Sequence, residues 1–513
     1  MRRTACAGTR EAGGRAAASI RRTLAIGFTA LTAMTPEALA AQAGVKQQST
    51  KTALDRTKMP PVGPAPTLRV PAWTTATLSN GARLIVSPKR DLPLVSFTIT
   101  FEGGANQFEP ADKVGLATAV AQMLSEGTTT RTGEQISEEQ QLLGTTISAS
   151  ISGERGSIGF QALKDRFAPA VALVADMMLN PSFPPDALER LRARALVQLA
   201  QNRDQPFVIS SNVFQRVLYG TDHPYGRFMT DATVKAITRD DVVAFHRAYF
   251  RPARAIITVT GDVEPNAVRR ELERALAAWP AGGEKASFAY PSLSAPQPRT
   301  IYLVDKPKAA QSSFAIGIPG PPRDTPDYYA IQVMNFILGG HFQSRLNHNI
   351  REVKGYSYGV RSGFDYGKGP GAFRAGGEVV SAKTDSALIE FMKELRGIVN
   401  GERPITDDEI TQAKQSMIQR LPANFASVSA TASSITNIYV QGLPEDYYQS
   451  FAARVNAVTR DDLLRVAKQY IDLDRLAIII VGDRATIEES LAKVGVGPIT
   501  VLDIEGKRVG ATP

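Results

Sequence analysis

Residues 236–262, AITRDDVVAFHRAYFRPARAIITVTGD, recur 221 positions later as residues 457–483, AVTRDDLLRVAKQYIDLDRLAIIIVGD. The two stretches align without gaps and are identical at 10 of 27 positions, far more than chance would give. Each opens on Thr-Arg-Asp-Asp, which is typical of a capped helix start, and continues into an apolar strand that ends in Gly-Asp. Self-similarity at this distance indicates a duplicated unit of about 220 residues.

The sequence before the first copy predicts a mixture of strands and helices. Strands are expected at residues 75–78, 83–87, 94–101, 145–151 and 157–162. The first two flank Asn80-Gly81, a residue pair typical of a tight hairpin. Helices are expected at 115–124 and from Asp186, where Asp186 and Glu189 have the spacing of a helix-capping pair.

The repeat and local composition together set the expected domain boundaries. These are a signal peptide at 1–43, a polar and Pro-rich lead-in at 44–67, a first lobe at 68–281, a linker at 282–300, a second lobe at 301–505 and a tail at 506–513. The chain is therefore expected to hold two related lobes joined by a linker.

The first 43 residues are typical of an export signal. Six arginines within residues 2–22 precede the uncharged run 23–35, and small-residue cleavage sites follow at Ala40 and Ala43. That run is too short to span a bilayer as a helix, which needs about 18 apolar residues, so we expect a periplasmic protein without a membrane span. The only cysteine, Cys6, lies in this segment, so the processed chain is expected to have no disulfide and no thiol nucleophile.

Composition indicates a globular protein and gives no sign of a nucleic-acid partner. The chain is 43% hydrophobic and 21% charged, as soluble folded proteins are. Removing residues 1–43 takes away six Arg and two Glu, so the formal net charge falls from +9 to +5. No basic cluster with interleaved aromatic residues accompanies this small excess, so no nucleic-acid binding is expected.

Residues 115–128, GLATAVAQMLSEGT, predict a helix that places Thr118, Ala121 and Gln122 on one face. Their flanks, Gly-Leu-Ala before and Met-Leu and Gly-Thr after, resemble the M16 peptidases, the family of pitrilysin, insulinase and mitochondrial processing peptidase. The family signature at this place is His-x-x-Glu-His, followed 76 residues later by a second metal-binding Glu. That count leads to Gln198. The resemblance therefore implies that all four zinc-site positions are degenerate, and we expect no metal or other cofactor in this chain.

The resemblance also implies the fold class. It is α+β, with two homologous lobes that each consist of a mainly antiparallel sheet packed with helices, as in the M16 and LuxS-like metallohydrolases. This expectation agrees with the internal repeat.

Residues 337–362, ILGGHFQSRLNHNIREVKGYSYGVRS, resemble the second signature of the same family. The matching positions are Gly339-Gly340, Ser344-Arg345-Leu346, Arg351-Glu352, Gly355 and Tyr358, with Tyr356 in place of a more usual Leu. In active members this stretch supplies an Arg and a Tyr seven residues apart, which bind the substrate backbone and the oxyanion. Arg351 and Tyr358 have that spacing, and both are donors suited to a carbonyl that gains negative charge. The alternative is that Arg351 forms a salt bridge and Tyr358 packs at a strand start.

The four histidines offer no clear metal set. His223 and His246 are interpreted as structural, and His341 and His348, seven residues apart, indicate at most an adventitious metal site. The sequence contains no Gly-rich phosphate loop after a strand.

Three hypotheses for function follow from these patterns. In the first, the chain is a non-catalytic subunit of a heteromeric M16 zinc metallopeptidase. It closes the chamber and supplies Arg351 and Tyr358 in trans to a zinc-bearing His-x-x-Glu-His partner that hydrolyses peptides. In the second, it is a peptide-binding or scaffold pseudoenzyme with no peptidase role. In the third, it is an independent enzyme that uses another site.

Overall fold

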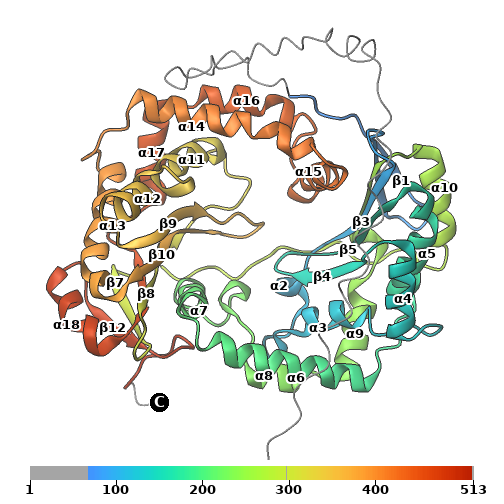
Figure 1. The fold of residues 1–513 in the computed structure, drawn as a ribbon, viewed down its shortest axis with the longest axis horizontal. Helices are drawn as coiled ribbons and strands as arrows, with labels where there is room; N and C mark the ends of the chain where they lie inside the picture. Colours follow the sequence, from blue (N-terminus) through green and yellow to red (C-terminus); the bar gives the residue numbers. More distant parts are fainter. Residues whose placement is uncertain (1–67, 296, 511–513) are drawn as a thin grey trace, which may run out of the picture. The chain divides into compact units, whose positions relative to one another are not determined.

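The computed structural model describes residues 68–295 and 297–510, in which two six-stranded sheets form the centres of two lobes (Figure 1). The predicted signal peptide and the lead-in lie outside the described residues. Among the helices of the described ranges, none is both long and apolar enough to cross a membrane. The predicted two-lobed α+β fold is confirmed.

The first sheet has the strand order β1-β2-β6-β3-β5-β4. Its strands are β1 Thr74–Thr77, β2 Arg83–Pro88, β3 Leu94–Glu102, β4 Ser148–Ser152, β5 Arg155–Leu163 and β6 Ala255–Gly261. Only β2 and β6 pair in parallel. The predicted hairpin is present between β1 and β2, and Gly81 occupies the positive φ, 95°, that the tight turn requires.

The second sheet repeats this arrangement in the order β12-β7-β11-β8-β10-β9. Its strands are β7 Thr300–Asp305, β8 Gln311–Pro319, β9 Ser357–Phe364, β10 Ala372–Val380, β11 Ala477–Gly482 and β12 Ile499–Leu502. Here β7 pairs in parallel with both β11 and β12, and the remaining pairs are antiparallel. Five strands of the two orders correspond along the sheets, as expected for a duplication, whereas the edge strands β1 and β12 differ in chain position and in direction of pairing.

The sequence repeat forms the same helix and strand in each lobe. Helix α9, Arg239–Tyr249, leads to β6, and helix α17, Arg460–Tyr470, leads to β11. Thr238 with Asp241 and Thr459 with Asp462 form matching capping boxes in which each hydroxyl accepts a backbone N–H at 3.2 Å. Both strands are buried throughout. The repeat therefore marks a buried structural element of each lobe.

Each lobe also contributes one helix to the other lobe. Helix α7, Pro206–Tyr219, packs on β8 and β11 of the second sheet, and helix α15, Val428–Gln441, packs on β3 and β6 of the first (Figure 1). Hydroxyl contacts support both placements, Ser210 to Ser313 at 2.9 Å and Thr258 to Thr436 at 2.7 Å. This reciprocal exchange was not expected from the sequence.

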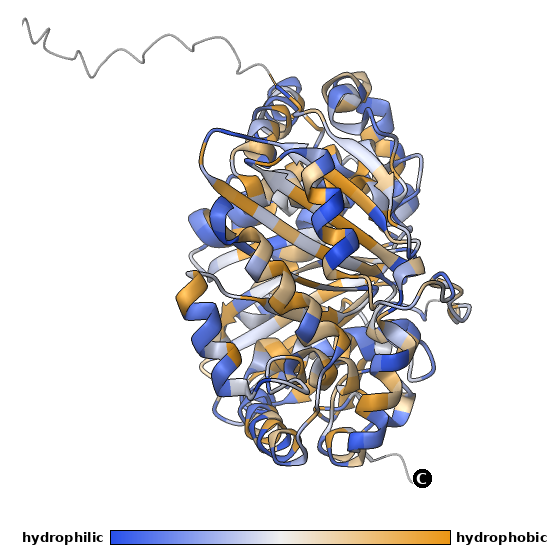
Figure 2. Ribbon diagram, turned by 90° about the vertical axis from the view of Figure 1, so that its right-hand side faces the viewer, coloured by the Kyte–Doolittle hydropathy of each residue, from blue (hydrophilic) through white to orange (hydrophobic). Residues whose placement is uncertain are grey.

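The remaining helices cover the sheets and the ends of the lobes. In the first lobe they are α2 Ala105–Phe108, α3 Leu116–Met123, α4 Gly133–Leu143, α5 Phe167–Leu179, α6 Pro185–Asn202, α8 Asp231–Ala236 and α10 Pro265–Ala275. In the second they are α11 Tyr328–Asn335, α12 Arg345–Asn347, α13 Thr384–Val399, α14 Asp407–Gln419, α16 Tyr447–Ala457 and α18 Arg484–Val494. Figure 2 shows apolar residues gathered along the strands and polar residues on the outer faces of many helices.

The predicted start of α6 is correct in position, but the predicted capping pair is not formed. The helix begins at Pro185 behind Pro184, and neither residue supplies a side-chain cap. Asp186 instead forms an ion pair with Arg190 one turn along the helix. Pro at the first helical position needs no N–H partner, which removes one of the unsatisfied donors that a cap would serve.

Candidate functional site

Helix α3 is fixed at its start by a glycine and a carboxylate. Gly115 precedes the helix with a positive φ of 108°, which a residue with a Cβ adopts only with strain. One oxygen of Glu109 accepts the N–H groups of Gly115 at 3.0 Å and of Ala117 at 2.7 Å. Burial raises the pKa of Glu109, although these two hydrogen bonds oppose the shift. These contacts hold the helix in place without any metal ligand.

The four degenerate positions lie together in the structure. Thr118, Ala121 and Gln122 of α3 and Gln198 of α6 all line one cavity of about 750 Å³. Ser148 and Ala149 of the edge strand β4 form part of the same wall, and Met177 and Leu191 contribute apolar surface. The spacing of 76 residues therefore does bring the second helix to face the first.

The residues of this cavity do not fit a zinc ion. Gln198 donates an amide hydrogen bond to Asn202 at 2.9 Å, and Thr118 and Gln122 offer only neutral oxygen and nitrogen atoms. The single carboxylate on the wall, Glu126, forms ion pairs with Arg190 at 2.9 Å and Arg194 at 3.6 Å. Zinc sites in proteins are built from imidazole, thiolate and carboxylate ligands. Across the described ranges, no group of three or more His, Cys, Asp or Glu residues is placed to hold a metal.

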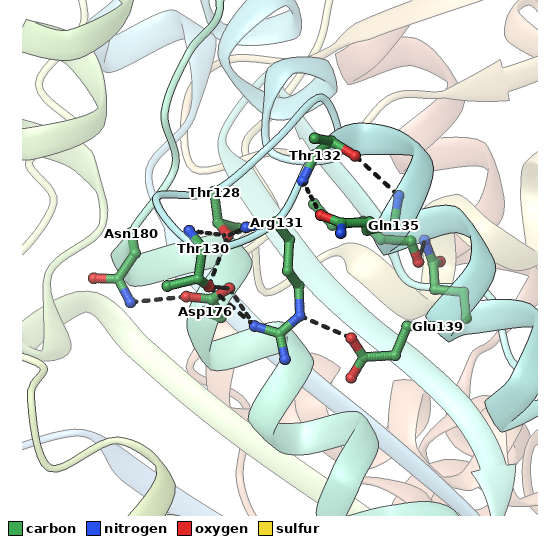
Figure 3. A network of polar contacts seen from close by, with 10 residues as sticks. Thr128, Thr130, Arg131, Thr132, Gln135, Glu139, Asp176 and Asn180 are labelled. Atoms are coloured by element: carbon green, nitrogen blue, oxygen red, sulfur yellow. Dashed lines mark hydrogen bonds and ion pairs between the residues drawn. The ribbon is translucent and has the colours of Figure 1, made fainter.

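A polar network stabilises the turn that follows α3 (Figure 3). Asp176 of α5 accepts hydrogen bonds from Asn180 at 2.9 Å, Arg131 at 2.8 Å and Thr130 at 3.2 Å. Burial would raise the pKa of Asp176, but the hydrogen bonds outweigh it and hold the pKa below its ordinary value. Arg131 also binds Glu139 of α4 at 2.7 Å, so one guanidinium ties the turn to two helices. The network keeps the Gly-Thr turn in place beside the cavity.

Arg351 and Tyr358 lie in the second lobe, where Tyr358 is exposed and Arg351 is half-buried. Tyr358 is on the edge strand β9 and is 88% exposed. Arg351 lies on a π-helical turn, 4.4 Å above the ring of Phe342 and 3.3 Å from the carboxylate of Glu352. Neither side chain lines the cavity of the first lobe.

The other residues of the second signature have structural roles. Arg345 is buried, binds Glu409 through two contacts of 2.7 Å and donates to two backbone carbonyls. Asn347 accepts the N–H of Val360 at 3.1 Å and so holds β9. A Cβ on Gly339 would lie 2.3 Å from Ser362 Oγ, which explains the glycine at this position. The segment that presents Arg351 and Tyr358 is therefore anchored on both sides.

Three of the four histidines make a polar contact with the backbone through one ring nitrogen. His223 accepts the Tyr225 N–H at 3.1 Å and stacks between Tyr219 and Tyr290. His246 Nε2 lies 2.8 Å from the Met178 carbonyl, and His341 Nδ1 lies 3.2 Å from the Phe336 carbonyl. Burial lowers the pKa of each of these three imidazoles.

No pattern in the sequence predicts a carboxylate that joins the two lobes. Glu154, at the tip of the β4–β5 hairpin, accepts the backbone N–H groups of Lys368 at 2.7 Å and Gly369 at 3.3 Å. It also accepts the hydroxyls of Tyr225 and Tyr290. Four donors thus converge on one side chain from the other lobe, the linker and the loop after α7. Only the tertiary structure brings these segments together.

Comparison with known proteins now places the chain in a family. The family model for the insulinase-type M16 peptidases matches residues 85–221, and the model for the peptidase M16 inactive domain matches residues 236–417. The chain belongs to the M16 peptidase family. It is a member whose zinc motif is absent at all four positions, as the sequence indicated.

The similar M16 proteins include one named as a zinc protease and one named as a non-peptidase homolog. The chain is 26% identical, over 66% of its length and 76% of the relative, to an uncharacterized zinc protease of Mycobacterium leprae. It is 22% identical, over 77% of its length and 90% of the relative, to the non-peptidase homolog YmxG of Helicobacter pylori.

Solved structures share the fold. A peptidase M16 inactive domain from Pseudomonas fluorescens has a TM-score of 0.73 and 24% identity, covering 80% of this chain and 98% of that one. A protease from Helicobacter pylori has the same TM-score with 18% identity, covering 81% of this chain and all of that one. These similarities support the two-lobed fold of this M16 protein.

Proposed function

We propose that this M16 protein is a non-catalytic subunit of a heteromeric zinc metallopeptidase. In this proposal it helps to close the chamber and supplies Arg351 and Tyr358 to the active site of a zinc-bearing partner with His-x-x-Glu-His. The observation that carries the proposal is the exposure of Tyr358, 88%, on a strand that is otherwise firmly held. A phenol exposed to that degree contributes little to packing, so a role in stability alone explains it poorly.

The chemistry of the pair suits peptide hydrolysis in trans. The Tyr358 hydroxyl can donate to a carbonyl oxygen as it gains charge, and the Arg351 guanidinium can hold the substrate backbone. The stacking of Arg351 on Phe342 and its ion pair with Glu352 limit the positions of the guanidinium. Such pre-organised donors lose little entropy when a substrate arrives.

The first lobe would contribute a wall of the chamber without chemistry of its own. The edge strand β4 runs along the 750 Å³ cavity, and its free edge offers backbone N–H and C=O groups. An extended peptide can pair with such an edge. The neutral side chains at the degenerate positions would contact that peptide but could not activate a water molecule.

The expected export of the chain belongs to the same proposal. A signal peptide cleaved near Ala40 or Ala43 would place the protein in the periplasm, together with an exported partner. Mass spectrometry of the N-terminal peptide of the protein from its native host tests this. A mature chain that still carries residues 1–39 would contradict it.

The deciding experiment uses the complex purified from the native host. Tyr358→Phe should leave complex formation intact and lower the kcat of peptide cleavage by about 10²–10³-fold, the usual effect of losing one oxyanion donor. Tyr356→Phe, two residues away and half-buried, is the matched control and should leave kcat unchanged. Arg351→Ala should act mainly on KM, because it removes binding that substrate and transition state share.

One result would reverse the proposal. Wild-type turnover in a complex that carries both Arg351→Ala and Tyr358→Phe would mean that the pair is structural. The peptide-binding or scaffold hypothesis would then be the better one.

A further inference from the structure

The face of the first sheet beneath α15 is lined with hydroxyl groups. Thr98 and Thr100 of β3 point to this face, because Thr98 pairs with Thr258, whose hydroxyl contacts Thr436 of α15. Ser157 pairs with Thr100, and Ser150 pairs with Ser157, so the hydroxyls continue across β5 to β4. The opposite face of the same strands carries the aliphatic and aromatic core. Helix α15 covers β3 and β6, so Thr100 is buried beneath it, whereas Ser150 of β4 is exposed and Ser157 of β5 is half-buried.

A recess of about 330 Å³ opens between this face and α15. Hydroxyl-bearing residues of β3, β4, β5 and α15 form most of its wall, together with Asn437 and Arg155. No Asp or Glu of the described ranges lines it. Its wall therefore combines several neutral donors with a single positive charge.

Arg155 is the charged group of the recess; the residue is exposed and forms no ion pair with any other described residue. Its cross-strand neighbour is Glu102 of β3. Glu102 and Glu154 line a different recess, which Arg155 also borders. An unpaired guanidinium beside a hydroxyl-lined space is a strong site for an anion, because its fork of N–H groups matches the oxygens of a carboxylate or phosphate.

Several of the hydroxyls are free to donate into the recess. Thr436 already donates to the Ala432 carbonyl, and Ser150 and Ser157 contact each other at 3.3 Å. Thr98 and Thr100 have no side-chain hydrogen bond to any other described residue. Each can rotate its O–H toward an oxygen atom in the recess.

We propose that this recess is an oxyanion-binding site that takes a phosphate or carboxylate group. Arg155 provides the charge, and Thr98 and Thr100 donate hydrogen bonds to the oxygens. A metal ion is disfavoured because no carboxylate lines the wall, and an apolar ligand would leave the hydroxyls without partners. The site belongs to this chain alone and does not depend on a zinc-bearing partner.

The test is calorimetric titration of the processed full chain with inorganic phosphate. Saturable binding that weakens as ionic strength rises is expected, since screening reduces the charge interaction. Arg155→Gln should raise the dissociation constant for phosphate by about 10–100-fold, and Thr100→Val by about 2–10-fold. Arg166→Gln, which alters an exposed arginine near the end of the same strand, is the control and should leave it unchanged.

A second series identifies the source of the oxyanion. A short peptide with a free C-terminal carboxylate is compared with its amidated form. Binding of the free form alone would identify a peptide terminus, and binding of phosphate alone would identify a phosphate-bearing ligand. If neither phosphate nor the free peptide binds, or if Arg155→Gln binds both as wild type does, the proposal is overturned. Should Arg155→Gln not fold, Arg155→Lys keeps the charge without the fork and should bind with intermediate affinity.

Discussion

The two lobes of this M16 protein share a framework and differ in what that framework presents. Both have the same order for five of their six strands and the same capped helix leading to a buried central strand. The first lobe gathers Thr118, Gln122 and Gln198 in a cavity that cannot hold zinc, whereas the second holds Arg351 and Tyr358 outward on an anchored segment. The comparison teaches that the framework of an M16 lobe does not depend on its reactive groups. In the first lobe Glu109 and Gly115 hold α3, and in the second Arg345 and Glu409 hold the signature segment.

The largest expected effect comes from separating the lobes, because each lobe contributes a helix that packs on the sheet of the other. A fragment of residues 68–281 lacks α15 on its sheet and exposes Ile209, Val213 and Phe214 of α7, which lie in a core cluster with the second sheet. We expect this fragment to aggregate, and co-expression with residues 282–510 to restore a soluble complex. Size-exclusion chromatography and circular dichroism measure both results. A monomeric 68–281 fragment with cooperative thermal unfolding would show that the helix exchange is dispensable.

The difference at the zinc site can be tested by reversing it. The purified wild-type chain should hold no stoichiometric zinc and cleave no peptide alone. The combined substitutions Thr118→His, Ala121→Glu, Gln122→His and Gln198→Glu place a full ligand set and a base on one cavity wall. Zinc affinity should then rise from unmeasurable to a dissociation constant of roughly micromolar or tighter.

Calorimetry with zinc measures this gain, with Gln198→Glu alone as the control that should not bind. If the fourfold variant folds and still binds no zinc, the α3 and α6 framework has shifted away from a metal-binding geometry. The view that only the reactive groups were lost would then be wrong.

The contact between the lobes should depend on Glu154. Glu154→Gln replaces a carboxylate with an amide that accepts at only one oxygen, so some of the four donors lose their partner. We expect the free energy of unfolding to fall by about 1–3 kcal/mol, measured by urea denaturation. Glu138→Gln, at an exposed position on α4, is the control. Equal stability of the two variants would show that Glu154 does not hold the lobes together.

The smallest effect concerns the turn beside the degenerate cavity. The lowered pKa of Asp176 means that its ionised form stabilises the folded state. This stability is present above the unfolded carboxyl pKa of about 3.9 and is lost as the pH falls through the lower folded pKa. Asp176→Asn should therefore cost about 1 kcal/mol at pH 7 and nothing near pH 2.

Thermal unfolding between pH 7 and pH 2 measures how the stability difference between wild type and Asp176→Asn shrinks as the pH falls. Asp165→Asn, at an exposed position, should match wild type throughout. A constant difference between Asp176→Asn and wild type at every pH would assign the effect to packing.

The sequence predicted those parts of the fold that local patterns determine. The capping residues Thr238 and Thr459, the hairpin at Gly81 and the shared face of Thr118 and Gln122 all follow from spacing along the chain. The exchange of α7 and α15 did not, because periodicity identifies an apolar helix face but not the sheet that covers it. Glu154 and Arg155 were missed for the same reason: Glu154 lies in the β4–β5 turn and Arg155 begins β5, and only distant segments give them their surroundings.

The exchanged helices also have a consequence for the order in which the chain folds. The first sheet cannot be covered until residues 428–441 have been made, more than 160 positions after its last strand. Contacts of such long sequence separation slow folding, because a large loop must close before they form. Synthesis from the N-terminus therefore leaves the face of β3 and β6 open for most of the time that the chain emerges. During that interval Ile85 and Ile256, which α15 later covers, stay exposed and can promote aggregation.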